Sequence, residues 1–208
     1  MSLTPGYGET PLPDDELEAL LPRIAELLGK PITKTAVYDL EQGVQEQVAE
    51  ELLIAALDGT LGLDELLNDF FLRDLHARLY SDIWTWGGAW RRRELNIGVA
   101  PEQIAVELRN SFDTIRYRWQ HTTDWTSRAL GIAVHAEAVR IHPFTDGNGR
   151  ATRLLADLVF TAAQESDQVL QYDWSVDKKR YIALLREYDG HRDVRELADF
   201  ITVRAIGP

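Results

Sequence analysis

Apolar side chains recur every three or four residues along most of this 208-residue chain, which is the spacing that lines one face of a helix. The stretch from residue 35 to 57 shows this pattern at Val37, Leu40, Val44, Val48 and Leu52. With proline, glycine and capping residues as boundaries, the same spacing predicts helices over about residues 14–29 (interrupted at Pro22), 35–57, 63–80, 101–120, 124–141, 148–164, 177–189 and 194–203. We therefore predict an all-α fold.

One stretch between these helices breaks the helical pattern. Gly87 and Gly88 follow two tryptophans and stop any helix, and three consecutive arginines come shortly after them. Residues 95–99, Leu-Asn-Ile-Gly-Val, are predicted to form a short strand or one arm of a hairpin. Residues 1–13, with three prolines and two glycines, are predicted to be an extended lead-in.

The length of the chain suits one well-buried domain. We divide it into an N-terminal helical extension, residues 1–62, and a core domain with C-terminal helices, residues 63–208. The two parts are expected to pack as one globular unit.

The composition narrows the function classes. Thirty-four acidic against 22 basic side chains give a formal net charge of −12, which repels nucleic acid and anionic lipid surfaces. An anion site must therefore be local, built from a few arginines and backbone amides. There is no cysteine, so disulfides and thiolate zinc sites are excluded. With no recognisable secretory signal and no apolar run long enough to cross a bilayer, the sequence predicts a cytoplasmic protein without membrane or nucleic-acid partners.

Most of the candidate chemistry lies in residues 141–153, which read Ile-His-Pro-Phe-Thr-Asp-Gly-Asn-Gly-Arg-Ala-Thr-Arg. The following proline places His142 at the end of the preceding helix, and a new helix is predicted to begin at Asn148. Its first backbone amides have no partner within the helix and lie at its positive end, so they favour phosphate. Arg150 and Arg153, one helical step apart, can both reach anionic oxygens. The segment therefore predicts a polyphosphate site.

Two further side chains of the segment add catalytic chemistry. Asp146 suits Mg²⁺, which usually takes one or two protein carboxylates and fills its other positions with water and phosphate oxygens. His142 is a candidate general base for a hydroxyl nucleophile. A helix end and a nearby carboxylate favour its charged form, whereas bound magnesium and the arginines favour the neutral form that a base needs. Each feature alone also has an ordinary explanation: a capping histidine, a surface turn, solvated arginines.

The segment is identified as the signature of the Fic (Fic/Doc) family, His-Pro-Phe-x-(Asp/Glu)-Gly-Asn-Gly-Arg-x-x-Arg, and fills every specified position. Residues 86–91, Trp-Gly-Gly-Ala-Trp-Arg, resemble the family's Trp-Ala-Gly-x-x-Arg segment, with Gly87 in place of alanine. Together with the stretch up to Val99, they also resemble a bacterial subgroup called mobile mystery protein B. The resemblance, over roughly residues 63–165, implies a Fic-type helical domain with a small β-hairpin flap beside the active-site loop.

By this resemblance the protein is a protein adenylyltransferase, which moves AMP from ATP to a Ser, Thr or Tyr hydroxyl of a target protein and releases pyrophosphate. His142 would be the catalytic base, and Asp146 would hold Mg²⁺. The other motif residues are assigned to nucleotide binding: Phe144, Gly147, Asn148, Gly149, Arg150 and Arg153. The flap would add a strand to the target backbone through Arg91, Leu95, Asn96, Ile97, Gly98 and Val99.

Relatives with the Fic fold also transfer other groups derived from nucleotides, such as phosphate or phosphocholine. Phosphate-transferring Doc proteins carry lysine in the place of Gly149, so the glycine of this chain favours AMP transfer.

Many Fic proteins are held inactive by a helix with the pattern (Ser/Thr)-x-x-x-Glu-(Gly/Asn), whose glutamate engages the second motif arginine, here Arg153. The nearest N-terminal match is residues 37–43, Val-Tyr-Asp-Leu-Glu-Gln-Gly, which lacks the hydroxyl residue and makes Glu41 the candidate inhibitory residue. The alternatives are that Glu41 faces solvent and that a separate antitoxin-like chain or other regulator controls a toxin-like protein. A homodimer is a further option.

Two other function classes compete with a transferase. In a metal-dependent hydrolase, His135 and His142, seven residues apart on one helical face, would bind a metal with Asp146. That hypothesis leaves the glycine-flanked turn and the paired arginines unexplained. In a protein that binds a nucleotide without modifying anything, the intact His142 would have no purpose.

Overall fold

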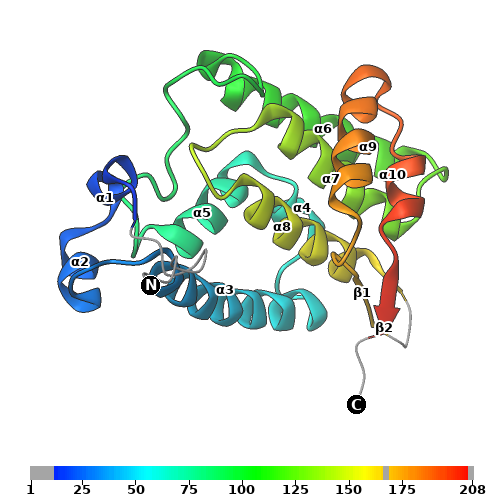
Figure 1. The fold of residues 1–208 in the computed structure, drawn as a ribbon. Helices are drawn as coiled ribbons and strands as arrows, with labels where there is room; N and C mark the ends of the chain where they lie inside the picture. Colours follow the sequence, from blue (N-terminus) through cyan, green and yellow to red (C-terminus); the bar gives the residue numbers. More distant parts are fainter. Residues whose placement is uncertain (1–11, 166–168, 206–208) are drawn as a thin grey trace.

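The computed structural model describes residues 12–165 and 169–205 (Figure 1). The predicted lead-in, residues 1–13, lies outside these residues except for its last two positions. The helices are α1 (Asp14–Ala19), α2 (Pro22–Leu28), α3 (Lys34–Leu57), α4 (Leu63–Leu66), α5 (Asp69–Tyr80), the short 3₁₀ helix η2 (Pro101–Gln103), α6 (Ile104–His121), α7 (Ser127–Ile141), α8 (Asn148–Ala163), α9 (Lys178–His191) and α10 (Arg195–Phe200). The all-α prediction is confirmed.

Local chemistry explains where several helices begin. The Thr33 side chain accepts a hydrogen bond from the backbone amide of Ala36 at the start of α3, at 3.3 Å. The predicted helix over residues 63–80 is divided into α4 and α5, because the Asn68 side chain caps α5 by accepting from the Phe70 amide at 2.9 Å. Capping signals of this kind are readable in the sequence, which is why most predicted boundaries agree closely with the structure.

Helices α7 and α8 form the centre of the molecule. Residues 130–138 of α7 are buried without interruption, His135 and Glu137 included, so other parts of the protein surround this helix on all sides. Helices α3 and α5 pack against α8, whereas α6 and α9 pack against α7 (Figure 1). The loop of residues 142–147 joins the two central helices, so it is anchored at both ends by the most buried elements of the fold.

The predicted strand at residues 95–99 is wrong in detail, because residues 96–99 form bends and Leu95 belongs to no strand. The segment does lie beside the loop of residues 142–147, where the Val99 amide donates to the Ile141 carbonyl at 3.2 Å. Within the described residues the two-stranded sheet lies elsewhere and was not predicted: β1 (Leu170–Tyr172) pairs antiparallel with β2 (Val203–Ala205). Three-residue strands carry too few positions to show alternation in the sequence.

No helix in the part of the chain that the structure describes is long and apolar enough to cross a membrane. The boundary between an extension and a core at residue 62 stays a prediction. The buried side chains on its two sides belong to one hydrophobic cluster.

Candidate active site

The loop at residues 142–147 has the shape that the sequence predicts. Helix α7 ends at Ile141 and is followed by His142, whose amide still donates to the Ala138 carbonyl at 3.0 Å while its backbone is left-handed, with φ of 53°. Helix α8 begins after Gly147, which is also left-handed, with φ of 74°. The chain therefore reverses sharply between two buried helices, and this brings the imidazole close to the start of α8.

A hydrogen-bonded ring inside the loop maintains this shape. The Asn148 side chain accepts from the Phe144 amide at 2.9 Å and donates to the Phe144 carbonyl at 2.8 Å. The Phe144 ring is fully buried and stacks on the imidazole of His76 with 3.5 Å between ring centroids. The expectation that Phe144 contacts the nucleotide is therefore wrong: its side chain anchors the loop in the core.

A cavity of about 580 Å³ opens beside the loop, within the range of natural small-molecule sites. Three parts of the chain that are distant in sequence line it. The motif contributes His142, Asn148, Gly149 and Arg153; residues 96–98 cover one side; helix α9 supplies Tyr181, Ile182 and Leu185 among others. The structure thus brings four motif residues and three of the six predicted flap residues to one space, together with α9, which the sequence did not implicate.

The start of α8 is uncapped by any side chain, which leaves its first amides available to an anion. The two motif glycines serve different purposes. A Cβ atom on Gly147 would lie 2.5 Å from the Tyr80 ring, so this glycine allows the loop to pack on α5. A Cβ on Gly149 would meet only the Arg153 guanidinium, at 3.9 Å. Gly149 is therefore the position that leaves space for a ligand.

The environment of His142 favours the neutral imidazole. Burial lowers its pKa, the positive charge of Arg91 lowers it further, and the Asp146 carboxylate opposes both. The sequence left this balance open, because burial and the approach of Arg91 depend on the folded chain. A neutral imidazole is the state that a general base requires.

Asp146 fits the role of a magnesium ligand. Asp146 is exposed, and its Oδ1 accepts a hydrogen bond from the Gly147 amide at 2.5 Å. In the described ranges no three acidic or histidine side chains cluster as a metal site. One carboxylate next to uncapped amides matches a cation whose remaining positions are filled by phosphate oxygens and water.

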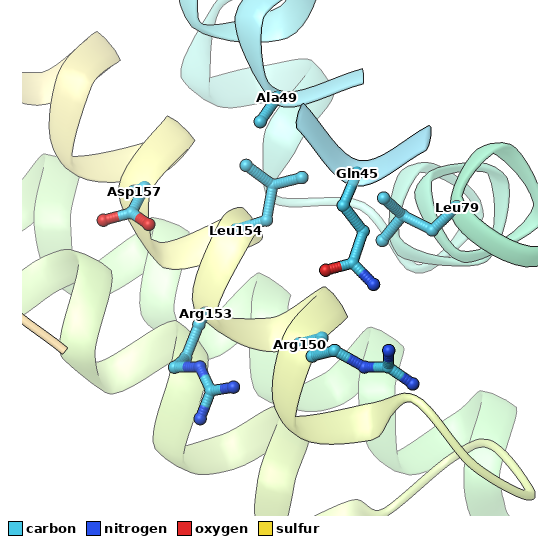
Figure 2. Close-up of a pocket in the computed structure, with 7 residues that line it drawn as sticks. All are labelled: Gln45, Ala49, Leu79, Arg150, Arg153, Leu154 and Asp157. Atoms are coloured by element: carbon cyan, nitrogen blue, oxygen red, sulfur yellow. The ribbon is translucent and has the colours of Figure 1, made fainter. Parts of the chain in front are cut away.

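The two motif arginines leave α8 in different directions (Figure 2). Arg150 makes an ion pair with Glu41 of α3 and lies 5.0 Å from the centre of the Tyr80 ring. Arg153 lines the large cavity, and both arginines line a smaller one of about 180 Å³ between α3 and α8. Only Arg153 of the pair therefore faces the large cavity.

Glu41 is 2% exposed and also accepts a hydrogen bond from Trp84 Nε1 at 2.7 Å. The alternative that it faces solvent is wrong. It does engage a motif arginine, but this partner is the first arginine, Arg150, rather than the second, Arg153.

The Arg91 side chain points inward from the flap. It is 3% exposed, and its guanidinium donates to the carbonyls of His142 at 2.7 Å, Arg93 at 2.9 Å and Val99. The Arg91 side chain is therefore not exposed for contact with a target: it ties the flap to the loop of residues 142–147. By contrast, Leu95 and Ile97 are 42% and 53% exposed and remain accessible to a target.

The glycine that departs from the family pattern has a structural reason. A Cβ atom on Gly87 would lie 2.4 Å from the Ser81 backbone nitrogen at the end of α5. The turn after Trp86 therefore packs too tightly against α5 for an alanine in this chain.

His135 does not join the site. It is fully buried and its Nε2 lies 2.5 Å from Tyr181 Oη, so it lies behind the cavity wall rather than beside Asp146. This placement contradicts the metal-hydrolase hypothesis. Sequence reasoning missed His76 and Tyr80, which contact the loop from α5; no local pattern marks them, because their partners lie more than 60 residues away.

Comparison with known proteins agrees with this geometry. The Fic/DOC family model matches residues 67–160. Residues 67–160, slightly less than half of the chain, are therefore similar to a Fic/DOC family domain. Protein adenylyltransferase fic-1 of Caenorhabditis elegans is 39% identical over 101 residues, which cover 46% of this chain and 19% of that protein. Protein adenylyltransferase Fic of Drosophila ananassae is 28% identical over 134 residues, 61% of this chain and 26% of that protein. The chain thus spans only about a fifth to a quarter of these relatives.

Solved structures support the same fold. The N-terminal Fic domain of a putative cell filamentation protein from Bartonella quintana has a TM-score of 0.60 at 17% identity, covering 80% of both chains. The BepC protein of Bartonella tribocorum, solved with bound AMPPNP, has a TM-score of 0.59 at 17% identity and covers 82% of this chain and 89% of its own. Helices outside the matched residues 67–160 therefore belong to the shared Fic fold as well.

Proposed function

We propose that this protein is an adenylyltransferase that moves AMP from ATP to a hydroxyl side chain of a target protein. The observation that carries the proposal is one cavity of about 580 Å³ lined by His142, Gly149 and Arg153. A neutral base, free helix amides and a guanidinium share this space. The relatives named protein adenylyltransferases and the AMPPNP-bound BepC structure support the choice of ATP.

The cavity offers different surroundings to the two ends of a nucleotide. The amides at the start of α8 and the Arg153 guanidinium suit the phosphates. Ile182 and Leu185 of α9 provide apolar surface for the adenine ring. We place the triphosphate along the α8 end of the cavity, and Asp146 would hold the magnesium ion.

In the proposed reaction His142 accepts the proton of the target hydroxyl as its oxygen bonds to the α-phosphorus. The bond from that phosphorus to the α–β bridging oxygen breaks, and pyrophosphate leaves with the electron pair. Bound magnesium would neutralise charge on the phosphates. The α8 amides and Arg153 stabilise the charge that develops on the phosphate oxygens, so catalysis is mainly positioning and electrostatics.

The flap would receive the target segment. Asn96, Ile97 and Gly98 line the cavity, and the Ile97 side chain is exposed. A target backbone lying along them would present its hydroxyl to His142. Control by Glu41 or by a separate antitoxin-like regulator, assembly as a homodimer and a cytoplasmic location stay predictions.

The function is tested by incubating the protein with target-containing lysate and ATP labelled at the α or the γ position. We expect label on protein from α-labelled ATP only. His142→Asn should lower the rate of labelling by a factor of at least about 10², because asparagine tolerates the left-handed backbone but supplies no base.

The matched control is His121→Asn, at an exposed histidine on α6, which should label like the unmodified protein. Label from the γ position alone would establish a phosphotransferase instead. Full labelling by His142→Asn would remove this histidine from the mechanism.

A further inference from the structure

His76 on α5 is a fully buried histidine whose two ring nitrogens both have partners. The Gly88 amide donates to Nδ1 at 3.0 Å, so Nδ1 carries no proton. The proton must then be on Nε2, which donates to the Asp146 carbonyl at 3.0 Å. These two hydrogen bonds together therefore fix one tautomer of the buried ring.

This imidazole holds two segments that flank the candidate site. On one side Gly88 belongs to the turn that leads into the flap, and a Cβ atom there would lie 2.6 Å from Ala77 Cβ. On the other side the ring stacks on Phe144, nearly parallel at 4°. His76 therefore connects α5, the flap turn and the catalytic loop through three contacts.

The contact with Asp146 reaches its carboxylate through one peptide group. The carbonyl of the Asp146–Gly147 peptide accepts from His76 Nε2, and the amide of the same peptide donates to Asp146 Oδ1 at 2.5 Å. A peptide group is planar and rigid, so a donor that orients its carbonyl also orients its amide. The direction of the Asp146 carboxylate therefore depends on the proton on His76 Nε2.

We propose that His76 is a positioning residue that aims the Asp146 carboxylate at the magnesium ion of bound ATP. The inference rests on the proposed function, because Asp146 is the metal ligand there. The partners of ligating carboxylates commonly change metal affinity by roughly 10- to 100-fold when they are removed. A histidine that merely filled the core would leave the magnesium dependence of nucleotide binding unchanged.

Two substitutions separate the two ring nitrogens. His76→Gln places an amide N–H near the Nε2 position, so it keeps a donor for the Asp146 carbonyl and gives up the Gly88 contact. His76→Asn places a carbonyl oxygen near the Nδ1 position, so it keeps the Gly88 contact and gives up the donor. Both lose the aromatic stacking on Phe144, and each therefore serves as the control for the other.

The measurement is ATP binding by isothermal titration calorimetry, with excess Mg²⁺ and with EDTA, without any target protein. Thermal unfolding checks that each variant folds. We expect His76→Asn to reduce the gain in affinity from magnesium by about tenfold and His76→Gln to keep most of it. Binding in EDTA should be alike in all three proteins.

Equal magnesium gains in the two variants would overturn the positioning role while leaving the proposed function intact. An unmodified protein that gains nothing from magnesium would overturn both. If neither variant folds, ¹⁵N chemical shifts of the histidine rings in the unmodified protein decide: a protonated Nε2 on His76 supports the proposal, and a protonated Nδ1 contradicts it.

Discussion

At the scale of single residues, Glu41 determines where Arg150 lies. The carboxylate is buried against α8 and has two partners, the Arg150 guanidinium and the Trp84 indole. Removing one partner of a buried ion pair leaves the other as an uncompensated charge, so the pair is costly to break. Arg150 is therefore turned toward α3 and Tyr80, away from the cavity that faces His142.

We predict that Glu41→Gln raises the rate of AMP transfer at least severalfold. Glutamine keeps an oxygen for Trp84 but removes the charge that holds Arg150, so the guanidinium is free to turn toward the phosphates. The same change should lower the free energy of unfolding by about 1–3 kcal/mol. Initial rates with α-labelled ATP and urea unfolding measure the two effects.

Glu46→Gln is the matched control, because Glu46 is an exposed residue on the same helix. It should change neither quantity. A Glu41→Gln protein that is less stable but no more active would leave Glu41 with a purely structural role and favour control by a separate chain.

At the scale of elements, the sequence predicts what neighbouring residues determine. The end of α7 follows from Pro143 and the start of α8 follows from Gly147, because each residue restricts or frees the backbone next to it. The Glu41–Arg150 pair joins residues 109 positions apart, and His76 reaches Asp146 across 70. Contacts at such separations depend on how the helices pack. The sequence therefore predicts Glu41 as a candidate residue but not Arg150 as its partner, and no local pattern marks His76.

The prediction of a strand at residues 95–99 is wrong for a related reason. Alternating side chains at residues 95–99 suit a strand, but backbone hydrogen bonds of a strand need a neighbouring strand to receive them. Here the carbonyls of Arg93 and Val99 accept from the Arg91 guanidinium instead. One buried side chain thus takes the place of a pairing partner and holds the segment against the loop.

We therefore predict that Arg91→Lys loosens the flap without unfolding the protein. A lysine ammonium cannot match the planar fork that reaches three carbonyls. The Val99 amide, which donates to the Ile141 carbonyl, should exchange with solvent deuterium faster, and kcat/KM for a protein target should fall by about tenfold. Arg92→Lys, at the exposed neighbour, should change neither. Unchanged exchange at Val99 in Arg91→Lys would show that other contacts hold the flap.

At the scale of the whole molecule, buried titratable groups have opposite effects on how the free energy of unfolding depends on pH. Burial lowers the pKa of His76 to about 4 and that of His135 to about 3. Between these values and 6.5 the unfolded chain binds protons that the folded protein does not, so both groups make stability fall as pH falls. Composition alone cannot reveal this, since only the fold determines which histidines are buried.

Asp157 on α8 acts in the opposite direction. Burial raises its pKa to about 7, although the Trp174 indole donates to both carboxyl oxygens at 3.0 and 3.2 Å. Between the ordinary value of 3.8 and about 7 the folded protein keeps a proton that the unfolded chain releases. The stability contributed by Asp157 is therefore present at low pH and is lost as pH rises through 7, which partly offsets the two histidines.

Asp157→Asn should remove this offset while keeping an oxygen for Trp174. From pH 6.5 to 5 we expect the free energy of unfolding to fall by about 1 kcal/mol in the unmodified protein and by about 3 kcal/mol in the variant. Urea unfolding at both pH values measures this, with Asp74→Asn, an exposed carboxyl on α5, as the control that should follow the unmodified protein. Parallel losses in Asp157→Asn and the unmodified protein would mean that Asp157 is ionised in the folded state at both pH values, with the Trp174 indole and the charges of Arg153 and Arg204 outweighing the effect of burial.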